Sequence, residues 1–163
     1  MLTVTSVQPV REEPLLLEID EYVPLRLRTS REPLGAAFLR LGNRSTTLLE
    51  IAVEPYAQRV RGVTLTFFEK LSPWPSFSVE NTAEGLPVLA TAFEDRKVVD
   101  LQQDFGVSIR EGEVLLFWGS PGACDVCEFR GRVRFLIQNG KLAGVWVLGL
   151  SREEIEMFSF RVR

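Results

Sequence analysis

The sequence contains no histidine among its 163 residues. This absence excludes Ser-His-Asp and Cys-His arrangements, and it removes the commonest general base of enzymes. Phosphate-binding loops of the Walker or G-x-G-x-x-G type are also missing, so nucleotide binding through such loops has no support. We therefore expect a protein that is not an enzyme.

The sequence also lacks long apolar runs, and its basic residues do not outnumber its acidic ones. The net charge of −3 argues against binding to nucleic acid, which rests on a basic surface. The longest nearly apolar run, Leu142 to Leu150, is much shorter than the ~20 residues of a membrane-spanning helix. The first residues do not follow the pattern of a secretory signal. We expect a soluble, cytoplasmic protein with no nucleic-acid or membrane partner.

Cysteine is scarce, with only Cys124 and Cys127 in the stretch CDVC. The C-x₂-C spacing suits half of a zinc site, but the other ligands would have to be Asp125, Glu128 or a second copy of the chain. A thioredoxin-like centre needs a thiolate at a helix N-terminus, whereas this motif leads into an expected strand with acidic neighbours. We expect two reduced thiols and no cofactor. The alternative is a metal- or redox-linked protein that uses Cys124 and Cys127, including across a homodimer.

The overall composition is typical of one globular domain. Hydrophobic residues make up 45% and charged residues 25% of the chain. Short runs of β-branched and aromatic residues alternate with a period of two and are separated by Gly, Pro and Asn. This pattern predicts a single, mainly β domain, all-β or β-rich α+β, with antiparallel sheets. Ser151 and Glu154 form an S-x-x-E capping box that predicts a short helix from Arg152 to about Phe158.

Two segments of the chain share a hairpin pattern, LLEIAVEPYAQRVRGVTLTF and RVRFLIQNGKLAGVWVL. Asn139-Gly140 in the second is the strongest short hairpin signal, because both residues tolerate the positive φ of a type I′ turn. In each return strand the apolar parity changes beside a glycine, which predicts a β-bulge at Gly62 and at Gly144.

These similarities predict an internal duplication. The two related hairpin units are residues 35–71 and 113–150, and the Pro-rich segment 71–87 is expected to connect them outside any sheet. An alignment of FLRLG, ending at Gly42, with LLFWG, ending at Gly119, places CDVC in a loop insertion of the second unit. Such insertions are common places for function.

The best candidates for partner contact are three arginines and a tryptophan. Arg130, Arg132 and Arg134 alternate with apolar residues, which predicts three guanidinium groups on one face of a strand. That face is either the ordinary wet side of the sheet or a recognition stripe for an acidic protein surface. Trp74, between two prolines, either fills the core of its own domain or contacts a partner.

These observations favour a non-enzymatic, soluble protein-binding domain whose partner is another protein. A specific version is an immunity or antitoxin-like protein that covers a bacterial toxin. The pattern LLEIAVEP…RGVTLTF resembles members of that broad group, although no motif assigns the chain to a family. A carboxylate enzyme or small-ligand binder is a third hypothesis, based on the acidic residues from Glu94 to Asp104.

Overall fold

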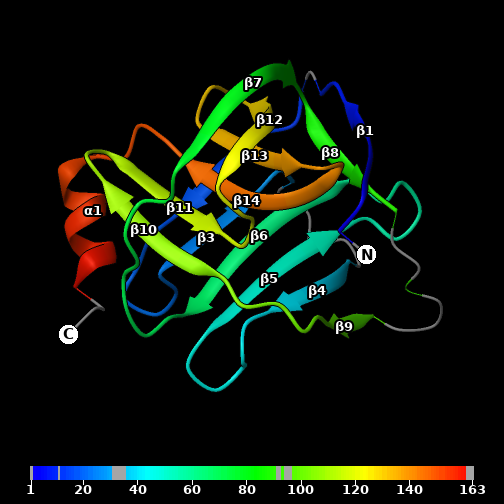
Figure 1. The fold of residues 1–163 in the computed structure, drawn as a ribbon. Coiled ribbons are helices and arrows are strands. Elements are labelled where there is room, and N and C mark those ends of the chain that lie inside the picture. The colour runs from blue at the N-terminus through cyan, green and yellow to red at the C-terminus, as the bar shows by residue number, and fades with distance from the viewer. Residues whose placement is uncertain (1, 11, 31–35, 91–92, 94–96, 161–163) are drawn as a thin grey trace.

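A computed structural model describes residues 2–10, 12–30, 36–90, 93 and 97–160. Short strands dominate the described part, and one helix, α1 (Arg152–Ser159), follows the last of them (Figure 1). The strands are β1 (Val4–Gln8), β2 (Leu16–Glu18), β3 (Leu25–Arg28), β4 (Ala37–Leu41), β5 (Leu48–Val53), β6 (Val60–Phe67), β7 (Phe77–Glu84), β8 (Leu86–Leu89), β9 (Val98–Asp100), β10 (Gly106–Arg110), β11 (Glu113–Phe117), β12 (Gly122–Phe129), β13 (Val133–Gln138) and β14 (Lys141–Val147).

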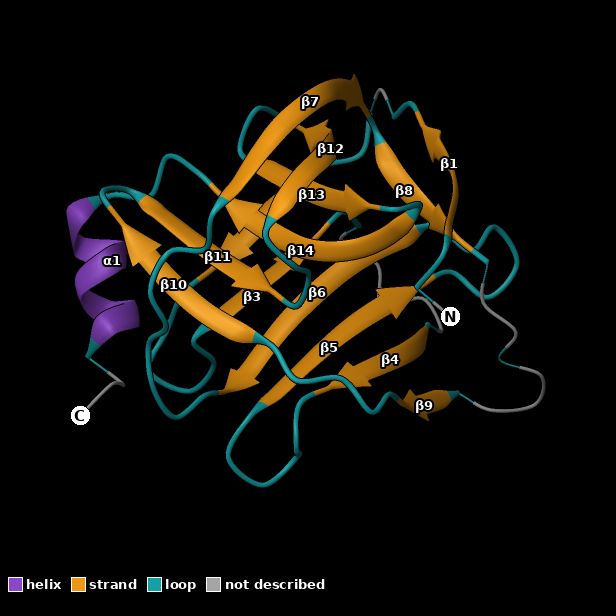
Figure 2. Ribbon diagram, viewed as in Figure 1, coloured by secondary structure: helices purple, strands orange, loops and turns teal. Residues whose placement is uncertain are grey.

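Most strands belong to two six-stranded sheets. The first sheet has the order β2-β3-β6-β5-β4-β9, and the second sheet has the order β10-β11-β14-β13-β12-β7. The remaining strands, β1 and β8, form an antiparallel ribbon at the end of the molecule opposite α1 (Figure 2). The predicted mainly β fold with a short C-terminal helix is confirmed.

The two sheets have the same internal order. In each, five strands consecutive in the chain occupy equivalent places, β2 to β6 in the first sheet and β10 to β14 in the second. A sixth strand from the middle of the chain joins the edge in parallel, β9 beside β4 and β7 beside β12. Duplication of one unit would produce this arrangement, but the duplication itself stays a prediction.

Both predicted hairpins contain the expected β-bulge. In the first, Ala52 pairs with Gly62 but Val53 pairs with Val60, so Arg61 is the extra residue. In the second, Leu136 pairs with Gly144 and Ile137 with Leu142, which leaves Ala143 as the extra residue. The inserted residue thus directly precedes the glycine in both hairpins. Asn139 and Gly140 adopt φ values of 52° and 74°, as the predicted turn requires.

The segment 71–87 is not a connection outside the sheets, so this prediction is wrong. It contains β7 and the start of β8. Pro73 and Pro75 precede β7 and therefore do not interrupt its backbone hydrogen bonds. Pro87 lies in β8, in the two-stranded ribbon, where it faces Val7 of β1.

CDVC lies within β12, so its prediction as a loop insertion is also wrong. The alignment behind it matched β4, which ends at Leu41, with β11, which ends at Phe117. The strand order shows that the counterpart of β4 is β12, because each pairs with the first strand of the bulged hairpin. Cys127 opposite Phe135 corresponds to Leu39 opposite Ile51.

One continuous hydrophobic core fills the space between the two sheets. Leu39 and Ile51 from the first sheet and Phe135 and Val145 from the second are all fully buried in it. A smaller cluster covers the outer face of the second sheet, and its buried members are Leu115, Phe117, Val126, Leu136, Ala143 and Trp146.

The helix α1 begins with the predicted capping box. Ser151 Oγ accepts a hydrogen bond from Glu154 N at 3.0 Å, and Ser151 N donates to Glu154 Oε1 at 3.0 Å. Phe158 anchors the helix by stacking on Phe68 with ring centroids 5.2 Å apart. In the described part of the chain, no helix is long and apolar enough to cross a membrane.

Candidate functional site

Both cysteines are buried in β12. Cys127 is fully buried in the core between the sheets, and Cys124 is 1% exposed. Burial raises the pKa of the Cys127 thiol to about 12. Burial and the negative charge of Asp125 also raise the pKa of Cys124. Neutral thiols are poor nucleophiles and poor metal ligands. Among the described residues, no group of three or more His, Cys, Asp or Glu side chains is placed to hold a metal ion.

The three candidate arginines do not form a row on one strand. Arg130 lies in the turn before β13 with a φ of 56°, and its guanidinium donates to Glu13 O at 2.6 and 3.0 Å. Arg132, also before β13, donates to the backbone oxygens of Leu148 and Gly149. Arg134 is the member that lies within β13. Only Arg134 can follow the alternation of a strand, because β13 begins at Val133 and the other two arginines precede it.

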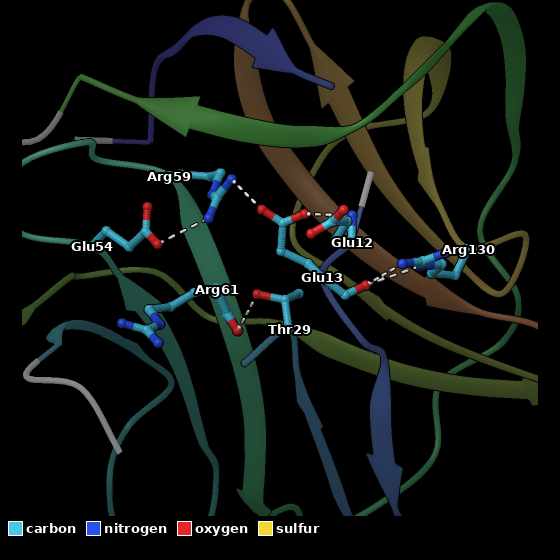
Figure 3. Close-up of polar contacts among 7 residues, drawn as sticks. All are labelled: Glu12, Glu13, Thr29, Glu54, Arg59, Arg61 and Arg130. Atoms are coloured by element: carbon cyan, nitrogen blue, oxygen red, sulfur yellow. Dashed lines mark hydrogen bonds and ion pairs between the residues drawn. The ribbon is translucent and has the colours of Figure 1, made fainter. Parts of the chain in front are cut away.

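Arg130 reaches a network that fixes residues 12 and 13 against the first sheet (Figure 3). Arg59 bridges Glu13 at 3.1 Å and Glu54 at 3.0 Å. Burial raises the pKa of Glu13, but backbone N–H groups of Glu13 and Glu12 and the charge of Arg59 outweigh it, so the net pKa lies below its usual value. The contacts of Arg130 therefore hold the chain together, and a role in partner binding stays a prediction.

Arg134 and Trp74 meet on the outer face of the second sheet. Trp74 packs edge-on against Trp146 with centroids 6.0 Å apart, and Arg134 lies 4.7 Å above the Trp146 ring. Arg134 also pairs with Glu128 at 3.0 Å, and Arg110 stacks on Trp74 at 4.0 Å. These contacts favour the interpretation in which Trp74 covers its own domain.

The acidic segment has a structural contact as well. Asp100 forms an ion pair with Arg40 at 2.6 Å, which connects β9 to β4. The hydrogen bond from Arg40 holds the pKa of Asp100 below its usual value against the opposing effect of desolvation. Glu94 and Asp95 lie outside the described residues.

A groove of about 700 Å³ lies beside α1, and it was missed by the sequence reasoning. We call it the helix groove, and its lining is Glu21, Pro24, Phe67, Phe68, Glu153, Glu156, Met157 and Phe160. Met157 is 47% exposed and Phe160 is 70% exposed, which is unusual for large apolar side chains. Glu153, Glu156 and Met157 of α1 and its C-cap residue Phe160 have the spacing i, i+3, i+4, i+7, so one face of the helix lines the groove.

The helix groove combines an apolar floor with an acidic rim. Glu21, Glu153 and Glu156 bring three carboxylates to it. Among the described residues, the only ion pair of these glutamates joins Glu156 to Arg152 at 3.2 Å, and the two side chains are 66% and 91% exposed. Such an exposed pair is weak, so the rim keeps its attraction for cations. The spacing of Glu153, Glu156, Met157 and Phe160 was the available sequence signal for this groove. The sequence does not show that Glu21 and Phe67, which are distant in the chain, lie beside them.

No model of a known protein family and no curated protein matches the chain.

Proposed function

We propose that this protein is a non-enzymatic protein-binding domain that holds a basic, amphipathic segment of a partner protein in the helix groove. The observation that carries this proposal is the exposure of Met157 and Phe160 beside three glutamates. We retain the cytoplasmic location expected from the sequence as part of the proposal.

The chemistry of the groove selects its occupant. Phe67, Phe68, Met157 and Phe160 offer apolar contacts, and burying one large apolar side chain is worth about 1.5–3 kcal/mol. The carboxylates at the rim attract lysine and arginine and repel acidic segments. A helix with an apolar face flanked by basic residues satisfies both conditions, as in other helix-in-groove complexes. A toxin with such a segment fits the immunity-like version of this proposal.

The first test measures binding of a fluorescent peptide made of leucine and lysine in an amphipathic helical pattern. We expect its fluorescence anisotropy to rise on addition of the protein, whereas a leucine–glutamate peptide of the same pattern does not bind. Phe160→Ser should weaken binding about tenfold or more, because it removes an apolar contact without disturbing the core. Glu153→Lys combined with Glu156→Lys should do the same through charge.

Tyr56→Ser is the matched control, since Tyr56 is 99% exposed and does not line the groove. It should bind the leucine–lysine peptide with unchanged affinity. Equal binding of the acidic peptide, or equal weakening by Tyr56→Ser and Phe160→Ser, would contradict the proposal. The burial and raised pKa values of Cys124 and Cys127 give the metal- or redox-linked alternative less support.

A further inference from the structure

The outer face of the first sheet contains a second hollow, which shares no lining residue with the helix groove. We call it the arginine groove, and it encloses about 190 Å³ over β3, β4, β5 and β6. Ala52 and Gly62 face each other across β5 and β6 and leave room there because their side chains are small or absent. The walls include Arg26, Arg28 and Arg61.

Arg61 is the distinctive residue of this groove. It is the inserted residue of the first bulge, and it is only 7% exposed. Its backbone oxygen accepts hydrogen bonds from Thr29 N at 2.9 Å and Thr29 Oγ1 at 3.1 Å. Its guanidinium makes no hydrogen bond or ion pair with another described residue, and Figure 3 shows it pointing away from the Glu13–Arg59 network. The residue is nearly buried, so its guanidinium has lost much of its hydration without gaining a protein partner among the described residues, and an anion in the groove would stabilise it.

Arg28 supplies a second unsatisfied donor. Its Nε is buried and has no hydrogen-bond partner among the described residues. Its Nη2 pairs with Glu18 at 3.3 Å, and Arg26 lies 3.9 Å from the same carboxylate. Glu18 is therefore shared between two arginines and leaves donor capacity on both.

The balance of charge around the groove favours a singly charged ligand. Among the described residues, the groove and its ion-pair partners hold three guanidinium groups, those of Arg26, Arg28 and Arg61, and two carboxylates, Glu18 and Glu50. One positive charge is left, and a carboxylate neutralises it, whereas a phosphate dianion would leave an excess of negative charge. The neighbouring Arg40 is already paired with Asp100.

We propose that the arginine groove binds the carboxylate of a small organic acid, held by Arg61 and Arg28. Arginine presents a planar fork that matches a carboxylate with two parallel hydrogen bonds. Phe38 in the groove wall offers an apolar surface for the rest of the ligand. This site is independent of the helix groove and of the partner proposed for it.

The test titrates the isotope-labelled full chain with benzoate and follows backbone amide signals by NMR. We expect the signals of Ala52 and Gly62 to shift with benzoate, and Arg61→Met to weaken binding at least about tenfold. Arg44→Met is the control, because Arg44 is a surface residue that does not line the groove, and it should bind like the original protein. Without benzoate, Arg61→Met should unfold at the same temperature as the original protein or a higher one, because it removes a largely dehydrated charge that has no partner among the described residues.

Four other results would each overturn this proposal. A clear fall in the melting temperature of Arg61→Met without ligand would show a purely structural arginine. Inorganic phosphate that binds more tightly than benzoate would exclude the carboxylate assignment. A blocked tetraglutamate peptide that binds more tightly would assign the groove to an acidic protein segment instead. Absence of any shift at Ala52 and Gly62 would remove the site, and the leucine–lysine peptide result would be unaffected.

Discussion

At the scale of single residues, Cys127 shows how position decides chemistry. A C-x₂-C spacing suggests a reactive pair, but Cys127 occupies the place in the second sheet that Leu39 occupies in the first. Both side chains are fully buried in the shared core. A cysteine in such a place behaves as a small hydrophobic residue with an inert thiol.

The raised pKa of Cys127 predicts a specific loss of stability at alkaline pH. The folded protein keeps this thiol protonated up to a pKa of about 12, whereas the unfolded chain releases the proton near the ordinary value of 9.0. Its contribution is therefore constant below pH 9 and is lost as the pH rises from 9 towards 12. Urea unfolding at pH 8 and pH 10 should show that the original protein loses about 1 kcal/mol more than Cys127→Val. Equal losses in the two proteins would contradict this prediction.

At the scale of secondary-structure elements, the two bulged hairpins are equivalent in register but not in crowding. A side chain at Gly144 would place its Cβ 2.8 Å from Leu116 O and 3.1 Å from Phe117 Cδ2. At Gly62 the nearest atom would be Leu27 O at 3.1 Å. The neighbouring backbone oxygen is closer at Gly144, and two side-chain atoms follow at 3.1 and 3.2 Å, whereas the next atoms at Gly62 lie at 3.6 and 3.7 Å.

This difference predicts unequal effects of one substitution at two matched sites. Gly144→Ala should destabilise the protein by about 1–3 kcal/mol, because backbone and ring atoms must move to admit a methyl group. Gly62→Ala should cost clearly less. Chemical denaturation of the two variants measures both values, and equal losses would show that the crowding at Gly144 relaxes without cost.

At the scale of the whole molecule, we expect the two sheets to unfold as one cooperative unit. They share a core, and the middle of the chain contributes an edge strand to each sheet, β7 to the second and β9 to the first. Damage to one sheet should therefore unfold the other. All three tryptophans, Trp74, Trp118 and Trp146, follow the strands β2 to β6 in the chain, and Trp74 and Trp146 pack on the second sheet.

Ile51→Ala tests this cooperativity, because Ile51 is fully buried in β5 of the first sheet. We expect it to lower the free energy of unfolding by about 2–5 kcal/mol. Tryptophan fluorescence and far-ultraviolet circular dichroism should report the same transition. Val98→Ala, at a position 43% exposed on β9, is the control and should have little effect. Separate transitions for the two probes would show that the sheets unfold independently.

The sequence predicted those parts of the fold that local patterns encode, namely individual strands, a hairpin turn and the helix. Alternation identified most of the buried strands but not β12, Asn139-Gly140 identified a hairpin, and Ser151 with Glu154 identified α1. The strand β7 escaped because seven of its eight residues are exposed, so no apolar alternation marks it. Its pairing with β12 joins segments far apart in the chain, which a local pattern does not encode.

The candidate sites were less predictable for the same reason. The bulge at Arg61 could be inferred from Gly62, but the burial of its side chain depends on neighbours from β3 and β4. The helix groove similarly needs Phe67 and Glu21 beside α1. Sequence reasoning instead selected Arg130 and Arg132, which look available but bind backbone oxygens of their own chain.

The parallel edge strand β7 has a consequence for synthesis on the ribosome. Because β9 follows its partner β4 in the chain, the first sheet can complete its edge as soon as β9 emerges. In contrast, β7 emerges before β12 and must wait for it. At about 5–20 residues per second this wait lasts roughly 2–8 s. The polar sequence of β7, FSVENTAE, suits the interval, because a nascent strand without apolar alternation is a poor template for aggregation.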